Sequence, residues 1–297
     1  IFNKIKGPPL NSFKGLLIIL IVIGHNRLVL EDFQNLRNFL YFFHVQMFLV
    51  LGVVLNKYPL NLNFIRDKIV RLLVPYFSFL TIYTLIFNLG DKQLFSVLNN
   101  FFRGISLSNY ITVKESSGFA SLWFLPCLFV LLILDSLFLR NNIKLNSILF
   151  IFCIINYFLI SKINPVFNIY GIFTALYFLP ISIFIRSLFK KIKFKFSNIF
   201  ILFVLLVICS FFYEKSFTGL EPGLLKLYGL NQSYEFFWYF ITFPIWTLIL
   251  GLSSRIYQNK FFDLLGKNTL IIYLIHQPIQ IVILKIIEIF NLNISPY

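Results

Sequence analysis

A lysine and a histidine in the first hydrophobic segment have types and a spacing that suit a functional site. Lys14 and His25 are eleven residues apart, which is about three helical turns and about 16 Å, so both side chains lie on one face of a helix. The residues between them are nearly all aliphatic, which places His25 near the middle of a bilayer and Lys14 at its edge. A titratable ring is expensive to bury in hydrocarbon, so His25 is a functional candidate. The alternative is a histidine that only forms a hydrogen bond to a neighbouring helix.

A pair of basic residues precedes a later hydrophobic segment. Lys68 and Arg71 are three residues apart, so they share a helical face at the predicted cytoplasmic entrance of the third span. Two neighbouring cations suit a phosphate or pyrophosphate, which arginine binds in a bidentate fashion. The alternative is ordinary flanking charge whose side chains reach the membrane interface.

Three further groups of polar or aromatic residues lie within hydrophobic runs. Tyr273 and His276 share a face near midplane depth, and a functional role is slightly favoured for them. His44 and Gln46 indicate either a lined cavity or a hydrogen bond between helices. Trp123 opens the fourth span, where a tryptophan by itself is an interfacial anchor.

These residues must be positioned by membrane-spanning helices, because the composition excludes a soluble domain. The chain of 297 residues is 59% hydrophobic and only 12% charged, about half the charge of a soluble protein. Runs that can span a bilayer recur about nine times, each near the required ~20 residues. They lie at about 16–30, 39–55, 72–90, 122–139, 146–161, 169–189, 197–213, 236–252 and 268–290. The sequence therefore predicts an all-α, polytopic bundle with about nine spans and one membrane-embedded domain over residues 1–297.

The placement of charge predicts the orientation. With the N-terminus in the cytoplasm, most of the 26 lysines and arginines lie inside and most of the 11 acids outside, as the positive-inside rule requires. The net charge of +15 is therefore mainly a topology signal, and no nucleic-acid partner is expected. The three cysteines lie in hydrophobic runs and no metal-ligand spacing appears, so no metal is expected. The chain begins with Ile1 and stops soon after a span, so truncation at both ends is expected.

Several of these segments together resemble the acyltransferase 3 family of membrane enzymes, which O-acylate sugars of bacterial surface polysaccharides and lipids. The matching segments, in order, are Lys14-Gly15 with Gly24-His25, Phe43-His44 with Met47-Phe48 through Gly52, Lys68 and Arg71 before Pro75-Tyr76, Leu122–Leu125, and Ile272–His276. The resemblance covers the chain from about residue 10 to 280.

The sequence departs from the family pattern at several positions. Asn11 replaces a common acid, Gln46 replaces a proline, and Lys14 and Lys68 stand where the family has arginine. Lysine keeps the charge but loses the rigid fork of arginine, so donor contacts through it are expected to be looser. The family also usually has one more span after the late histidine, and its absence fits a truncated chain.

The resemblance implies a mechanism and a set of roles. Lys14, Lys68 and Arg71 would bind the phosphates of acetyl-CoA or another acyl-CoA at the cytoplasmic face. His25 would act as general base or carry the acyl group. Tyr273 and His276 would orient the acceptor or stabilise the oxyanion, and His44, Gln46 and Trp123 are assigned to substrate binding.

The acceptor would be a surface polysaccharide or a lipid-linked glycan at the outer face of the bacterial cytoplasmic membrane. The rival interpretations are a transporter or flippase of a polar lipid or sugar, and a structural membrane subunit.

Overall fold

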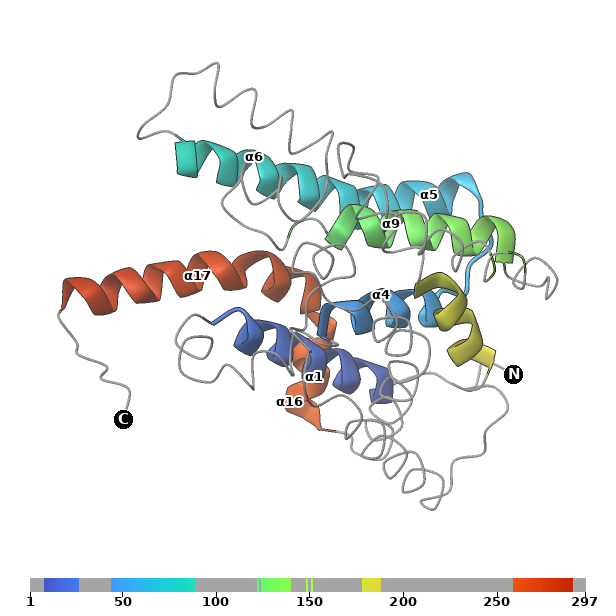
Figure 1. Cartoon of the computed structure of the whole chain (residues 1–297), viewed down its shortest axis with the longest axis horizontal. Coiled ribbons are helices and arrows are strands. Elements are labelled where there is room, and N and C mark those ends of the chain that lie inside the picture. Colours follow the sequence, from blue (N-terminus) through green and yellow to red (C-terminus); the bar gives the residue numbers. More distant parts are fainter. Residues whose placement is uncertain are drawn as a thin grey trace. The chain divides into compact units, whose positions relative to one another are not determined.

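Every element that the structure describes is a helix. The computed structural model describes residues 8–26, 44–88, 122, 124–139, 148, 151, 178–187 and 259–290 (Figure 1). Within these residues there is no β-strand. The prediction of an all-α protein is thereby confirmed for this part of the chain, whereas the number of spans and the cytoplasmic N-terminus remain predictions.

In chain order, the described helices are α1 (Pro8–Gly24), α4 (His44–Leu55), α5 (Leu62–Lys68), η2 (Ile69–Leu73), α6 (Val74–Asn88), α9 (Phe124–Leu134), η4 (Asp135–Leu139), α16 (Lys260–Lys267) and α17 (Thr269–Ile289). A further short helix covers Phe178–Ser187. The segments η2 and η4 are π-helical turns.

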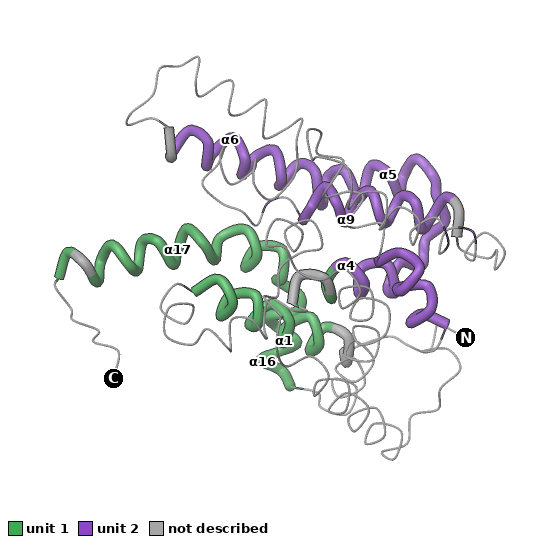
Figure 2. Tube along the Cα trace, in the orientation of Figure 1, with its two compact units in different colours: residues 1–48, 193–220, 228–297 green, residues 49–192, 221–227 purple. Residues whose placement is uncertain are grey.

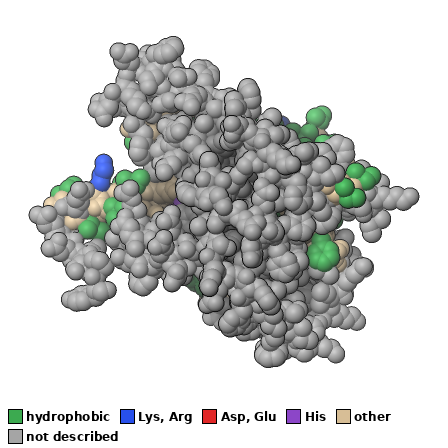
Figure 3. All heavy atoms as spheres, in the orientation of Figure 1, with side chains coloured by type: hydrophobic (Ala, Val, Ile, Leu, Met, Phe, Trp, Pro, Cys, Tyr) green, Lys and Arg blue, Asp and Glu red, His purple; other side chains and the backbone are tan. Residues whose placement is uncertain are grey.

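Two described helices are long and apolar enough to cross a membrane. They are Leu62–Ile86, with 25 residues, and Thr269–Ile287, with 19 residues. Shorter apolar helices cover Asn11–Gly24, Phe124–Leu137 and Phe178–Ser187. Large hydrophobic side chains stay exposed along both long helices, among them Ile86 of α6 and Val282 of α17, and most of the coloured side-chain surface in Figure 3 is hydrophobic. Such surfaces suit contact with lipid.

The first of these long helices begins earlier than the sequence predicted. Its predicted start was near residue 72, but α5 begins at Leu62, where the Asn61 side chain accepts a hydrogen bond of 2.7 Å from the Phe64 N–H. Asparagine is a good N-cap because its side-chain oxygen satisfies an N–H of the first turn. The basic pair therefore lies within a continuous helical segment rather than before one.

The chain divides into two compact units (Figure 2). Unit 1 comprises residues 1–48, 193–220 and 228–297 and contains α1, α16 and α17. Unit 2 comprises residues 49–192 and 221–227 and contains α5, η2, α6, α9, η4, the short helix Phe178–Ser187 and most of α4.

In unit 1, the backbones of α1 and α16 are in direct contact at two glycines. A Cβ atom on Gly15 would lie 2.0 Å from the carbonyl oxygen of Phe262, and one on Gly266 would lie 1.7 Å from the carbonyl oxygen of Asn11. Only glycine allows so close an approach of two helices. Phe13, Leu17 and other apolar side chains of α1 are almost fully buried. This seam fixes where the N-terminal half of α1 lies along α16.

In unit 2, aliphatic and aromatic side chains form a dry core. Leu49, Val50 and Val53 of α4 are buried, as are Tyr76 and Leu80 of α6 and Leu125 and Leu131 of α9. Gly52 also faces α9, because a Cβ there would lie 2.6 Å from a methyl carbon of Leu128. Polar residues at the C-terminal ends of α4 and α9 form the network described below.

Candidate active site

The structure brings the two predicted histidines of unit 1 together. His25 follows the last residue of α1 and His276 lies within α17, and their ring centroids are 5.1 Å apart with an interplanar angle of 76°. The Tyr273 ring lies 5.9 Å from that of His276. A hydrogen bond also joins α17 to α1: the Gln280 side chain donates to the Val22 carbonyl at 2.8 Å. Gln280 was not among the predicted site residues.

The backbone fixes the tautomer of both imidazoles. His25 Nδ1 lies 2.8 Å from the Ile21 carbonyl oxygen, and His276 Nδ1 lies 2.6 Å from the Tyr273 carbonyl oxygen. Because a carbonyl oxygen only accepts, each Nδ1 must carry hydrogen. In the neutral rings the lone pair is therefore on Nε2, which is the nitrogen that can accept a proton or a hydrogen bond.

One of these Nε2 atoms is available within a buried site. The His276 side chain is 4% exposed, and its Nε2 makes no hydrogen bond in the described part of the chain. Buried polar atoms in proteins almost always have a partner, so an unsatisfied one needs an explanation. A bound hydroxyl group is the kind of partner that would satisfy it. Among the residues that the structure describes, none form a cluster of three or more His, Cys, Asp or Glu that could hold a metal ion.

Lys14 lies at the opposite end of α1 from His25, beside α16. Its neighbour Gly15 contacts the backbone of Phe262, which brings Lys14 to the carboxylate of Asp263. The hydrogen bond from Lys267 is the main cause that holds the pKa of Asp263 below its ordinary value, and the charge of Lys14 lowers it further, although desolvation opposes both. Sequence reasoning missed Asp263, which stands outside the predicted spans.

The predicted basic pair belongs to unit 2, where one aspartate binds both of its members. Asp67 accepts contacts from Lys68 Nζ at 3.2 Å and from Arg71 Nε at 2.6 Å. Lys68 also lies over the Phe64 ring, 5.1 Å from its centroid. The Arg71 side chain is 71% exposed. Its π-helical turn is closed by a hydrogen bond from the Val74 N–H to the Ile69 carbonyl, and such turns are frequent at functional sites.

The remaining predicted residues are less informative. His44 and Gln46 occupy the first turn of α4, and their side chains are not among the described ones. Trp123 lies outside the described residues. The assignment of these three residues to substrate binding stays a prediction.

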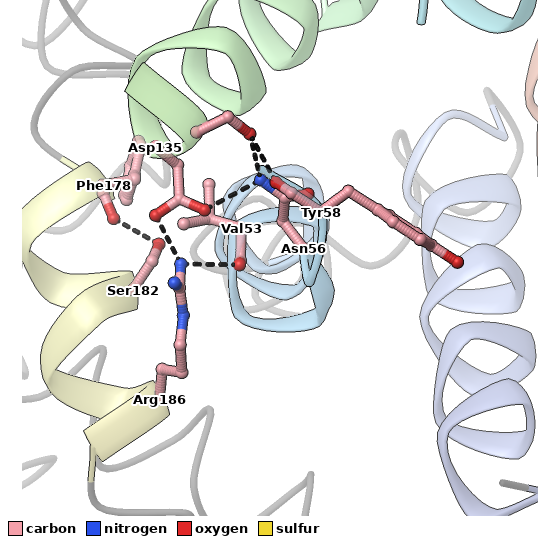
Figure 4. Close-up of polar contacts among 8 residues, drawn as sticks. Val53, Asn56, Tyr58, Asp135, Phe178, Ser182 and Arg186 are labelled. Atoms are coloured by element: carbon pink, nitrogen blue, oxygen red, sulfur yellow. Dashed lines mark hydrogen bonds and ion pairs between the residues drawn. The ribbon is translucent and has the colours of Figure 1, made fainter. Parts of the chain in front are cut away.

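Unit 2 also contains a buried polar network that the sequence reasoning missed (Figure 4). The Asp135 carboxylate, whose side chain is 1% exposed, forms an ion pair of 2.5 Å with Arg186 and accepts a hydrogen bond of 2.9 Å from Asn56. Arg186 also donates to the Val53 carbonyl at 2.8 Å. An acid and an arginine inside predicted spans were a usable signal, but the sequence analysis used their charges only to predict the orientation.

Comparison with known proteins supplies the class of activity. A family model for an acyltransferase domain, acyltransferase 3, matches residues 10–297. No curated protein and no solved structure matches the chain. The family match covers α1, α4 to α9, α16 and α17, and members of the family are membrane proteins. This chain therefore belongs to the acyltransferase 3 family.

Proposed function

We propose that the protein is a membrane O-acyltransferase. It would move an acetyl or another acyl group from a cytoplasmic acyl-CoA to a sugar hydroxyl of a surface polysaccharide or lipid-linked glycan. One observation supports this most strongly: two histidines of an acyltransferase chain meet at 5.1 Å, and one of them has a buried, unsatisfied Nε2. A transferase of this kind needs a base beside a bound hydroxyl.

The tautomer assigns a specific atom to the proton transfer. With hydrogen on Nδ1, His25 would use Nε2 to take the proton of the sugar hydroxyl while its oxygen attacks the thioester carbonyl. When the tetrahedral intermediate collapses, the carbon–sulfur bond breaks. The CoA thiolate then leaves and takes the proton from the imidazolium. The products are the O-acyl sugar and free CoA, and His25 returns to its neutral form.

The same tautomer separates the roles of the other two predicted catalytic residues. Neutral His276 accepts at Nε2, so it suits a hydrogen bond from a second hydroxyl of the acceptor sugar, because the attacking hydroxyl gives its one proton to His25. An oxyanion would need a donor instead. The Tyr273 hydroxyl can donate, and its ring lies beside that of His276. We therefore assign acceptor binding to His276 and stabilisation of the oxyanion to Tyr273.

The donor is expected to bind through its phosphates. Lys14 in unit 1 and the pair Lys68 and Arg71 in unit 2 are cations that a polyanionic acyl-CoA would seek. With the N-terminus in the cytoplasm, all three lie at the inner face of the bacterial cytoplasmic membrane, where acyl-CoA is made. The exposed guanidinium of Arg71 is well suited to a phosphate because it presents parallel donors.

A transporter or flippase is the second candidate, and it would need no covalent step. The test is incubation of purified protein in vesicles with radiolabelled acetyl-CoA and the envelope glycan extracted from a strain that lacks the protein. We expect labelled glycan that releases acetate on mild alkaline hydrolysis. Movement of glycan or lipid across the vesicle without label on any hydroxyl would favour the transporter and contradict the proposal.

A further inference from the structure

The seam between α1 and α16 places three charged side chains together. Gly15 approaches the backbone of Phe262, and Gly266 approaches that of Asn11. The residues next to these glycines cannot move apart without separating the helices. Asp263 follows Phe262 and so lies near Lys14, and Lys267 lies one helical turn further along α16, outside the long apolar part of α17.

The carboxylate of Asp263 interacts with both lysines, and its two oxygens have different surroundings. Its Oδ2 binds Lys267 Nζ at 2.7 Å. Its Oδ1 is buried and makes no hydrogen bond of normal geometry in the described part of the chain. The charge of Lys14 acts on the same carboxylate. Two lysines and one aspartate leave a net charge of about +1, which suits an anion.

We propose that Asp263 is a positioning residue that holds Lys14 and Lys267 as a pair of cations for a phosphate of the acyl-CoA donor. This rests on the proposed function, because Lys14 is there a donor-binding residue. Two neighbouring ammonium groups repel each other, and a carboxylate between them removes that repulsion and limits where their flexible side chains can go. The Lys267 side chain is 61% exposed, so a phosphate can reach it from water.

Purified full-length variants in vesicles test this role. Asp263→Asn keeps the shape of the side chain but removes its charge, and we expect the KM for acetyl-CoA to rise roughly fivefold while kcat stays within twofold. Lys267→Gln should raise KM in the same way, and Asp263→Glu should recover most of the affinity. Lys260→Gln is the matched control, because Lys260 is exposed at the start of the same helix and should leave KM unchanged.

A merely structural role would give a different result. If Asp263 only fastened α16 to α1, Asp263→Asn would lower kcat or the amount of folded protein, and KM would stay the same. That outcome, or equal KM values in Asp263→Asn and wild type, would overturn the proposal. Should Asp263→Asn fail to fold, Lys267→Gln and Asp263→Glu still decide the question through KM.

Binding measurements separate this proposal from the proposed function. Free CoA and 3′-dephospho-CoA are titrated into the wild type and the Lys267→Gln variant, with no acceptor present. Weaker CoA binding by the variant supports the phosphate site, even if the wild type transfers no acyl group to glycan. Equal CoA binding by both proteins overturns the site, whether or not transfer occurs. A loss of discrimination between the two ligands in the variant would assign the site to the 3′-phosphate.

Discussion

The hydrogen bonds of His25 and His276 to backbone carbonyls determine which ring nitrogen can take part in chemistry. Each ring donates from Nδ1 to a carbonyl oxygen one turn earlier, so in both neutral rings Nε2 is the nitrogen that can accept a proton. A carbonyl of the same helix turn is a rigid partner, because its position is fixed by the helix itself. These backbone contacts therefore orient both imidazoles.

Replacing His25 by alanine tests its role as base. We expect His25→Ala to lower the rate of acyl transfer by about 10²–10⁴ while the protein still inserts into the membrane, because the side chain is small and lies at the end of α1. The rate of label transfer is measured per amount of purified protein. Turnover close to that of wild type would show that His25 is not the base.

His276 belongs to the same experiment as a comparison. If it holds a second hydroxyl of the acceptor sugar, His276→Ala should raise the KM for the glycan as well as lower kcat, whereas the KM for acetyl-CoA should stay the same. A change in the donor KM alone would instead place His276 at the donor side.

Arg71 is expected to act on the donor rather than on the chemistry. Arg71→Ala should raise the KM for acetyl-CoA with little change in kcat, and Arg71→Lys should recover the affinity only in part, because lysine lacks the planar fork. Arg66→Ala is a matched control, since Arg66 is an exposed arginine one turn earlier. An unchanged donor KM in Arg71→Ala would place the phosphates elsewhere.

Sequence spacing could identify these side chains but not all of their partners. The i, i+3 spacing put Tyr273 and His276 on one face of a helix, and the described helix agrees. That α1 is the helix facing them follows from contacts between residues about 250 positions apart, which no local pattern encodes. The nearness of Asp263 to Lys14 on another helix was missed for the same reason, although its i, i+4 pair with Lys267 could have been read from the spacing.

At the scale of elements, the helix from Leu62 to Asn88 contains a π-helical turn at the basic pair. The sequence predicted the apolar part of this helix but not its early start at the Asn61 cap, and it gave no sign of the extra residue in the turn η2. That turn depends on how α9 and α5 pack beside it in unit 2, and helical periodicity alone assumes a regular α-helix. The ion pair of Asp67 with Arg71, by contrast, is an i, i+4 pair that helical spacing could have predicted.

The network of Asp135 and Arg186 ties three helical segments of unit 2 together, and its energy can be tested. Removing one charge leaves the other buried and unpaired, which costs about 3–5 kcal/mol. We expect Asp135→Asn and Arg186→Gln each to lower the midpoint of thermal unfolding in detergent. The double variant should unfold at a higher temperature than either single variant, because no uncompensated charge remains.

Ser187→Ala on the same short helix is the control. Its hydroxyl donates only to the Phe184 carbonyl of its own helix among the described contacts, so the unfolding midpoint should not change. Additive losses in the double variant would show that Asp135 and Arg186 do not depend on each other.

At the scale of the whole molecule, composition was enough to predict a helical membrane protein, and the motifs were enough to predict its family. The family match over residues 10–297 confirms the latter. Composition works because lipid requires every spanning backbone group to be satisfied within its own segment, which leaves helices as the solution for such apolar runs. The number of spans, predicted as about nine, and the identity of the acceptor stay predictions, because the described helices include only two that are long enough to span.

The orientation of the chain can be tested with cysteines in the predicted loops. The native cysteines are first replaced, and single cysteines are then introduced at Asn109, Ser233, Asn141 and Lys191. If the charge bias is correct, the first two should react with an impermeant thiol reagent in intact cells. The last two should react only after lysis, because their loops belong to the inner, positively charged side.

The same labelling experiment decides whether the proposed donor site faces its substrate. Acyl-CoA does not cross a membrane unaided, since it carries several phosphate charges. Lys14, Lys68 and Arg71 can therefore bind it only from the cytoplasmic face. Labelling of Lys191→Cys from outside would invert the chain and place all three cations away from acyl-CoA. In that case the donor site would have to be sought on the opposite side, while the histidine pair, which the sequence predicts near the middle of the bilayer, would still be within reach.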